Sequence, residues 1–199
     1  MTQEVQAAAR GRRQLMMIIA LFLVPPIAAW IAWQYLGEHG VSATTNAGTL
    51  ISPARPLGFE QLAQARSGVD ATELRGRWLY VVYAQHGCDA RCEKQLYLTR
   101  QVRIAVNKDT PRVKRLLVLG GGDAAQRAQI AEQHPDLLVV EGVSEQLSAN
   151  FNGSGFASAG EQFFLVDPLG NLMMFYDAEI SPKGILRDLQ KLLKISQVG

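Results

Sequence analysis

The chain has 199 residues, of which 48% are hydrophobic, and its formal net charge is +2 at pH 7. A charge this small, without a basic run interleaved with aromatic residues, argues against a nucleic-acid partner. Two cysteines are too few for a disulfide-rich mini-protein, and a chain of this length builds a core without covalent cross-links. We therefore expect one globular domain with extensions.

The first feature along the chain is an apolar stretch at residues 15–36, LMMIIALFLVPPIAAWIAWQYL, which contains no charged side chain. A bilayer core of about 30 Å requires about 20 apolar residues in a helix, so the stretch predicts one transmembrane anchor. Arg10, Arg12 and Arg13 precede it, and basic residues stay on the cytoplasmic side. We therefore expect residues 1–14 to be cytoplasmic. The rest of the chain is expected in the periplasm, as the extracytoplasmic part of a single-pass protein of the inner (plasma) membrane.

A cleaved signal peptide is the alternative, although the apolar region of such peptides is shorter. Both interpretations place the remainder in an oxidising compartment, where disulfides persist. Residues 37–56 are rich in Gly, Ser, Thr, Ala and Pro, which predicts a flexible tether. The globular domain is then expected at residues 57–199.

Strands and helices alternate in this domain. Five apolar runs have the length of buried strands: 78–84, 113–120, 136–142, 162–167 and 171–177. Helical patterns fall between and after them at 91–106, 123–134, 144–151 and 181–195. The turn sequence DPLGN predicts that the last two strands form an antiparallel hairpin. The order predicts an α/β fold with a mainly parallel central sheet, and the closing hairpin and helix narrow it to a thioredoxin-like sandwich.

The two cysteines, Cys88 and Cys92, lie where the first of these strands meets its helix. If Cys92 is in the first turn, the two side chains share a helical face, and Cα atoms about 6 Å apart are within disulfide range. Helix amides, Arg91 and Lys94 are expected to lower the pKa of the thiols. Thiolates exchange with disulfides and bind Cu(I). A structural disulfide, a redox pair and a pair of metal ligands remain open.

Several stretches resemble the Sco/SenC family of thioredoxin-like copper-site assembly proteins. These are ARPL (54–57) with TELRGRW (72–78), CDARC (88–92) with its Cys-x-x-x-Cys spacing, and FFLVDPLGNL (163–172). The resemblance implies a membrane-anchored assembly factor for respiratory cytochrome oxidase that handles copper, thiol redox or both. Its implied partner is a cytochrome oxidase subunit or another copper or thiol protein.

The sequence diverges from this family at the usual histidine ligand, whose position falls at or near Ala159. A third copper donor is then sought elsewhere, and His86, two residues before Cys88, is the nearest in sequence. One expectation is that Cys88, Cys92 and His86 coordinate copper. The absence of the family histidine favours an extracytoplasmic thiol-disulfide oxidoreductase without copper delivery as an alternative. A non-catalytic, degenerate interaction protein is a further alternative.

Overall fold

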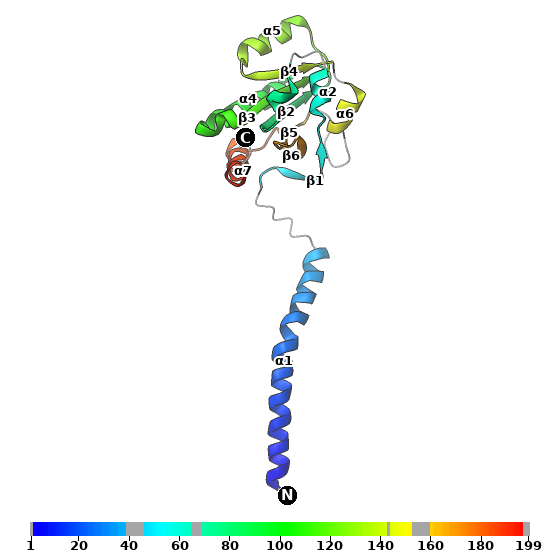
Figure 1. The fold of residues 1–199 in the computed structure, drawn as a ribbon, viewed down its shortest axis with the longest axis vertical. Helices are drawn as coiled ribbons and strands as arrows, with labels where there is room; N and C mark the ends of the chain where they lie inside the picture. Colours follow the sequence, from blue (N-terminus) through cyan, green and yellow to red (C-terminus); the bar gives the residue numbers. More distant parts are fainter. Residues whose placement is uncertain (1, 39–45, 65–68, 143, 153–159, 197–199) are drawn as a thin grey trace. The chain divides into compact units, whose positions relative to one another are not determined.

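The computed structural model of the chain consists of two compact units, Met1–Thr45 and Asn46–Gly199 (Figure 1). The structure describes residues 2–38, 46–64, 69–142, 144–152 and 160–196.

The first unit is the helix α1 (Thr2–Glu38). Its segment Arg12–Tyr35 has a mean hydropathy of 2.4 and is long and apolar enough to cross a membrane by length and composition. All side chains of this segment are exposed, whereas a core helix of a soluble domain would bury its apolar face. The expected apolar helix is therefore present, and the side of the membrane on which the chain continues stays a prediction.

The second unit contains a six-stranded sheet in the order β1-β6-β5-β2-β3-β4. The strands are β1 (Thr49–Pro56), β2 (Trp78–Ala84), β3 (Val113–Leu119), β4 (Leu137–Glu141), β5 (Gln162–Val166) and β6 (Asn171–Asp177). Strands β2, β3 and β4 are mutually parallel, and the other three neighbouring pairs are antiparallel. Because β6 is antiparallel to β5 and β5 to β2, β6 runs in the same direction as β2, β3 and β4. The sheet is thus mixed, with most strands running in one direction. The predicted β5–β6 hairpin is present and lies between β1 and β2.

Helices cover both faces of the sheet, so β2 lies between two apolar cores. Trp78, Tyr80 and Val82 face one core, and Leu79 and Val81 face the other. Residues from α4 (Ala90–Ala105), α5 (Ala124–Gln133) and α7 (Pro182–Ile195) pack in the first core. Residues from α2 (Phe59–Gln64), α3 (Ala71–Leu74) and α6 (Glu145–Phe151) pack in the second, and the 3-10 helix η1 (Asn107–Arg112) links α4 to β3. The predicted sandwich is therefore present.

Strand β1 corrects the predicted extent of the tether, because residues 49–56 pair with β6 at the edge of the sheet. Its side chains do not alternate between buried and exposed, and Pro53 and Pro56 interrupt it. Proline is confined to sheet edges because it cannot donate to the ladder, so this segment lacks a strand signature in the sequence. Residues 39–45 of the predicted tether lie outside the described part of the chain.

The start of the second unit is held by Asp188 of α7, which is 1% exposed. Its Oδ2 accepts hydrogen bonds from the N–H groups of Ala47 at 2.8 Å and Gly48 at 2.9 Å. The hydroxyl of Tyr176 donates to the same oxygen at 3.5 Å. A buried carboxylate is stable only when it is paired or hydrogen-bonded, so this contact fastens the chain entering β1 to α7.

Candidate functional site

Cys88 and Cys92 form a disulfide at the end of the central strand, with their Cα atoms 5.1 Å apart. Cys88 follows β2, and Cys92 lies in the first turn of α4. The predicted approach of the two side chains is therefore present. Both residues are largely buried, with 5% of Cys88 and 3% of Cys92 exposed. A reaction partner reaches this disulfide only through a local opening or a close surface contact.

Asp89, between the two cysteines in sequence, determines where α4 begins. Its carboxylate accepts hydrogen bonds from the N–H groups of Arg91 at 3.1 Å and Cys92 at 2.9 Å. Such an N-cap satisfies helix N–H groups that have no partner within the helix. The cap places Cys92 two residues beyond the first helical residue, Ala90, so that its side chain points back toward Cys88.

The cations that the sequence places beside the cysteines are each paired with a carboxylate. Arg91 lies 3.2 Å from Glu161 and 3.6 Å from Asp89, and Lys94 lies 2.6 Å from Glu179. Glu161 and Glu179 are far away in the chain, so the local sequence pointed to Arg91 and Lys94 alone. These carboxylates offset the positive field that was expected to activate the thiols.

Gln126 in the first turn of α5 holds the backbone of Cys88. Its Oε1 accepts a hydrogen bond from the Cys88 N–H at 3.1 Å, and its Nε2 donates to the Cys88 carbonyl at 2.8 Å. Asp123 caps α5 by accepting from the N–H of Gln126 at 2.7 Å. The position of Cys88 thus depends on a second strand–helix junction, which no local sequence pattern connects with the cysteines.

The glycines after β3 allow this junction to approach residues 85–88, which lead from β2 to the disulfide and are called the cysteine loop. A Cβ on Gly120 would clash with the carbonyl oxygen of Gln85, and a Cβ on Gly121 would lie 3.2 Å from the carbonyl carbon of His86. The N–H of Gly120 donates to the carbonyl of Ala84 at 2.8 Å. Side chains at these positions would push the two loops apart, so the glycines serve the packing of the site.

His86 is exposed and lies between two surface hollows. One hollow, with a volume of about 340 Å³, is also lined by Cys88 and Gln126. The other, with a volume of about 450 Å³, is also lined by Glu145 and Ser148. The cysteine loop therefore borders open space on both sides of His86.

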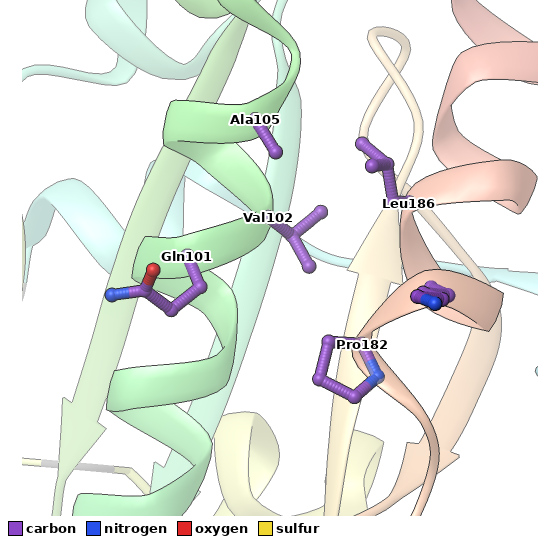
Figure 2. A pocket seen from close by; sticks show the side chains of 6 residues that line it. Gln101, Val102, Ala105, Pro182 and Leu186 are labelled. Carbon is purple, nitrogen blue, oxygen red and sulfur yellow. The ribbon is translucent and has the colours of Figure 1, made fainter.

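A third hollow, with a volume of about 200 Å³, lies between α4 and α7 (Figure 2). Val102, Ala105, Pro182 and Leu186 give it a mostly apolar lining. It contains neither cysteine nor His86, so it is not part of the candidate site.

Gln95, one helical turn beyond Cys92, was missed in the sequence. It is 0% exposed, and its Nε2 donates to the carbonyl of Gly160 at 3.0 Å. Together with the pair between Arg91 and Glu161, this bond ties the chain entering β5 to the helix that carries Cys92. In the sequence, the available sign of this role was a polar residue, Gln95, next to the apolar Leu96 and Leu98 on the buried side of α4.

Within the described residues, no group of three or more His, Cys, Asp and Glu side chains is placed to hold a metal ion. A disulfide offers no thiolate to copper, whereas the reduced pair of Cys88 and Cys92 would supply two soft donors that fit Cu(I). The family histidine position at Ala159 lies outside the described residues. The chemistry of the donor set thus fits copper only in part.

A strand that delivers a cysteine pair to the start of a helix, within a sandwich of one sheet covered by helices on both faces, defines the thioredoxin-like class. Residues 78–196 match the family described as "Transmembrane-like, thioredoxin-like, C-terminal domain". The chain belongs to this family. A comparison with curated protein sequences finds no match.

Solved structures similar to this chain come from several organisms. A putative thioredoxin from Neisseria meningitidis is 11% identical, with 76% of this chain and 93% of that chain covered and a TM-score of 0.50. Yeast Sco1 with copper bound is 15% identical, with 62% and 82% covered and a TM-score of 0.49. A secreted disulfide oxidoreductase from Mycobacterium tuberculosis is 14% identical, with 66% and 98% covered and a TM-score of 0.48. Several other similar structures are Sco or SenC proteins.

Proposed function

We propose that this protein is a membrane-anchored, Sco-like assembly factor for respiratory cytochrome oxidase. Its chemical activity is thiol-disulfide exchange through Cys88 and Cys92, outside the cytoplasm. The disulfide between the end of β2 and the first turn of α4 carries this proposal. A large domain with two extensive apolar cores gains little from closing so short a loop, so redox exchange explains the pair better than stabilisation does.

The geometry suggests which sulfur a partner attacks. Cys88 borders the hollow beside His86, and Cys92 does not line it. A partner thiolate attacks the sulfur of Cys88, forms a mixed disulfide and displaces Cys92 as a thiolate at the helix N-terminus, where the helix dipole favours negative charge. A second partner thiol then releases Cys88. Two electrons pass to the pair, and the partner leaves with a disulfide.

Copper handling by the reduced pair is a second candidate function. The observation that favours it is the exposed His86, which borders the same hollow as Cys88 and lies two residues away. Reduced Cys88 and Cys92 would hold Cu(I) as cargo, with the imidazole of His86 as a third donor.

Redox equilibration of the full chain tests the exchange activity. The fraction of reduced Cys88–Cys92 is measured by alkylation and mass spectrometry in glutathione buffers of graded potential, with Cys88→Ser/Cys92→Ser as the control. Reversible cycling near the poise of an oxidising compartment, roughly −200 mV, supports the proposal. A disulfide that resists reduction far below this poise contradicts it and indicates a structural bond.

Two further measurements separate the alternatives. X-ray absorption of the reduced, copper-loaded chain with and without His86→Ala identifies the ligands, and sulfur-only coordination in both removes the role of His86. In cells, full complementation of a deletion strain by Cys88→Ser/Cys92→Ser selects the non-catalytic interaction protein. Loss of oxidase assembly in that strain supports a role that requires the thiols.

A further inference from the structure

The helix α7 presents a continuous basic face. Lys183, Arg187, Lys191 and Lys194 are all exposed. At 100° of rotation per residue, their spacing of four, four and three residues places them within an arc of about 80°. The opposite face, which includes Ile185 and Leu189, is buried in the core, so the basic residues form the outer surface of the helix.

This basic face is not balanced within its own helix. Asp188 is the one acidic residue of Pro182–Ile195, and it is buried against the N–H groups of Ala47 and Gly48. Like charges at i and i+4 destabilise a helix slightly, and solvated helix faces usually interleave both signs. The four exposed basic side chains therefore concentrate positive charge on the outer surface of this helix.

The same helix also receives the chain that arrives from α1. Asp188 holds Ala47 and Gly48, and a Cβ on Gly184 would lie only 2.7 Å from the Cβ of Ala47. The basic face therefore belongs to the element at which the covalent connection to α1 enters the sheet domain.

The connection itself is short. Helix α1 ends at Glu38, so residues 39–46 separate it from Ala47, and eight residues reach at most about 28 Å even when extended. A short link of this kind gives the attached surface a high effective concentration at the bilayer whenever α1 spans it. Anionic headgroups attract basic residues by an amount that corresponds to about a fivefold change in binding per residue.

We propose that the basic face of α7 binds the anionic phospholipid headgroups of the membrane in which α1 is anchored. This inference rests on the anchor in the proposed function and is independent of the thiol chemistry. The contact orients the sheet domain at the membrane surface. Charge complementarity and the short link favour lipid over an acidic protein as the occupant.

Lysine acylation of the full chain in nanodiscs tests the proposal. Acetylation rates of Lys183, Lys191 and Lys194 are compared by mass spectrometry in phosphatidylcholine alone and in phosphatidylcholine mixed with phosphatidylglycerol. Lys114, outside α7, serves as the internal reference. We expect several-fold slower acetylation of the three α7 lysines in the anionic nanodiscs, restored by high salt, and an unchanged rate at Lys114.

Two variants sharpen the test, since each removes one exposed positive charge. Arg187→Gln is expected to weaken the protection of the α7 lysines about fivefold, whereas Lys108→Gln in η1 leaves it unchanged. Equal rates in both nanodiscs, or equal protection in neutral ones, overturn the proposal. Protection that appears only when an acidic protein is added overturns it in favour of that partner.

Failure of the chain to enter nanodiscs overturns both the anchor and this inference. The glutathione titration of Cys88 and Cys92 reports separately on thiol exchange, so the two failures are distinguishable.

Discussion

The side-chain amide of Gln126 makes two hydrogen bonds with the peptide of Cys88, one to its N–H at 3.1 Å and one to its carbonyl at 2.8 Å. The pair resembles the bonding between two strands, and it fastens the start of α5 to the loop that carries the disulfide. Since Cys92 is positioned by its own helix cap, the Gln126 contact decides how closely Cys88 is held to it.

We predict that Gln126→Glu weakens this hold. A carboxylate cannot donate to the Cys88 carbonyl, so one hydrogen bond is lost and the free energy of unfolding falls by about 1–2 kcal/mol. The thiols are then less well held at bonding distance, and the glutathione equilibrium shifts toward the dithiol. Urea unfolding and alkylation measure the two effects. Gln129→Glu, at an exposed position on the same helix, is the control, and equal redox midpoints in both variants would refute the positioning role.

Gly120→Ala is expected to displace the cysteine loop, because its Cβ would clash with the backbone oxygen of Gln85. Overpacking costs typically 1–3 kcal/mol, and the amides of residues 85–88 should exchange faster with solvent. Gly142→Ala is the matched control, with φ of +74° and open space around its Cβ, so it adds backbone strain of about 1 kcal/mol without a clash. Faster exchange at 85–88 in both variants would assign the effect to global destabilisation.

A partly buried charge cluster beneath α4 makes stability depend on pH. Arg115, fully buried, donates to both carboxylate oxygens of Asp136 at 3.1 and 3.3 Å, and Arg103 donates to one of them at 3.1 Å. Burial alone raises the pKa of Asp136, but the attraction and hydrogen bonds of Arg115, together with Arg103, hold the pKa below its usual value. Burial, with repulsion by Arg115 and Arg100, lowers the pKa of His134.

Both shifts make acid destabilising. The lowered pKa of Asp136 contributes stability above the ordinary carboxyl pKa, about 3.9, which is lost as the pH falls through the folded-state value. The lowered pKa of His134 means that the unfolded chain gains a proton more readily, so stability declines as the pH falls below about 6.5. His134→Gln should flatten urea stability between about pH 7 and 5, and Asp136→Asn should flatten it below about pH 4. An unchanged profile in either variant would contradict the assignment of that group.

Asp188→Ala is predicted to release the start of the sheet domain from α7. It leaves the buried N–H group of Gly48 without its acceptor, at a cost of about 1–3 kcal/mol, and it also removes the acceptor of the more exposed N–H group of Ala47. Hydrogen exchange should accelerate at these two amides and along β1. Gln190→Ala, on the exposed side of the same helix, should leave both amides unchanged. Intact protection in Asp188→Ala would show that β1 is held by its pairing with β6 alone.

Several elements followed from the sequence because their signals are local. The run at 78–84 is apolar throughout, as a strand covered on both faces requires, and its predicted ends coincide with those of β2. The apolar stripe and Pro182 predicted α7 to within one residue. Strand β1 was missed because an edge strand with two prolines has neither alternation nor an apolar run.

The site divides in the same way. The sequence by itself predicted that Cys88 and Cys92 approach each other if Cys92 lies in the first turn of a helix, and it showed that residues 15–36 are apolar and long enough to span a bilayer. Only the tertiary structure decided that Gln126 holds Cys88, that Glu161 and Glu179 offset Arg91 and Lys94, and that Asp188 anchors the entry of the chain. The physical reason is range: periodicity and capping act over a few residues, whereas these contacts join residues between 38 and 141 positions apart.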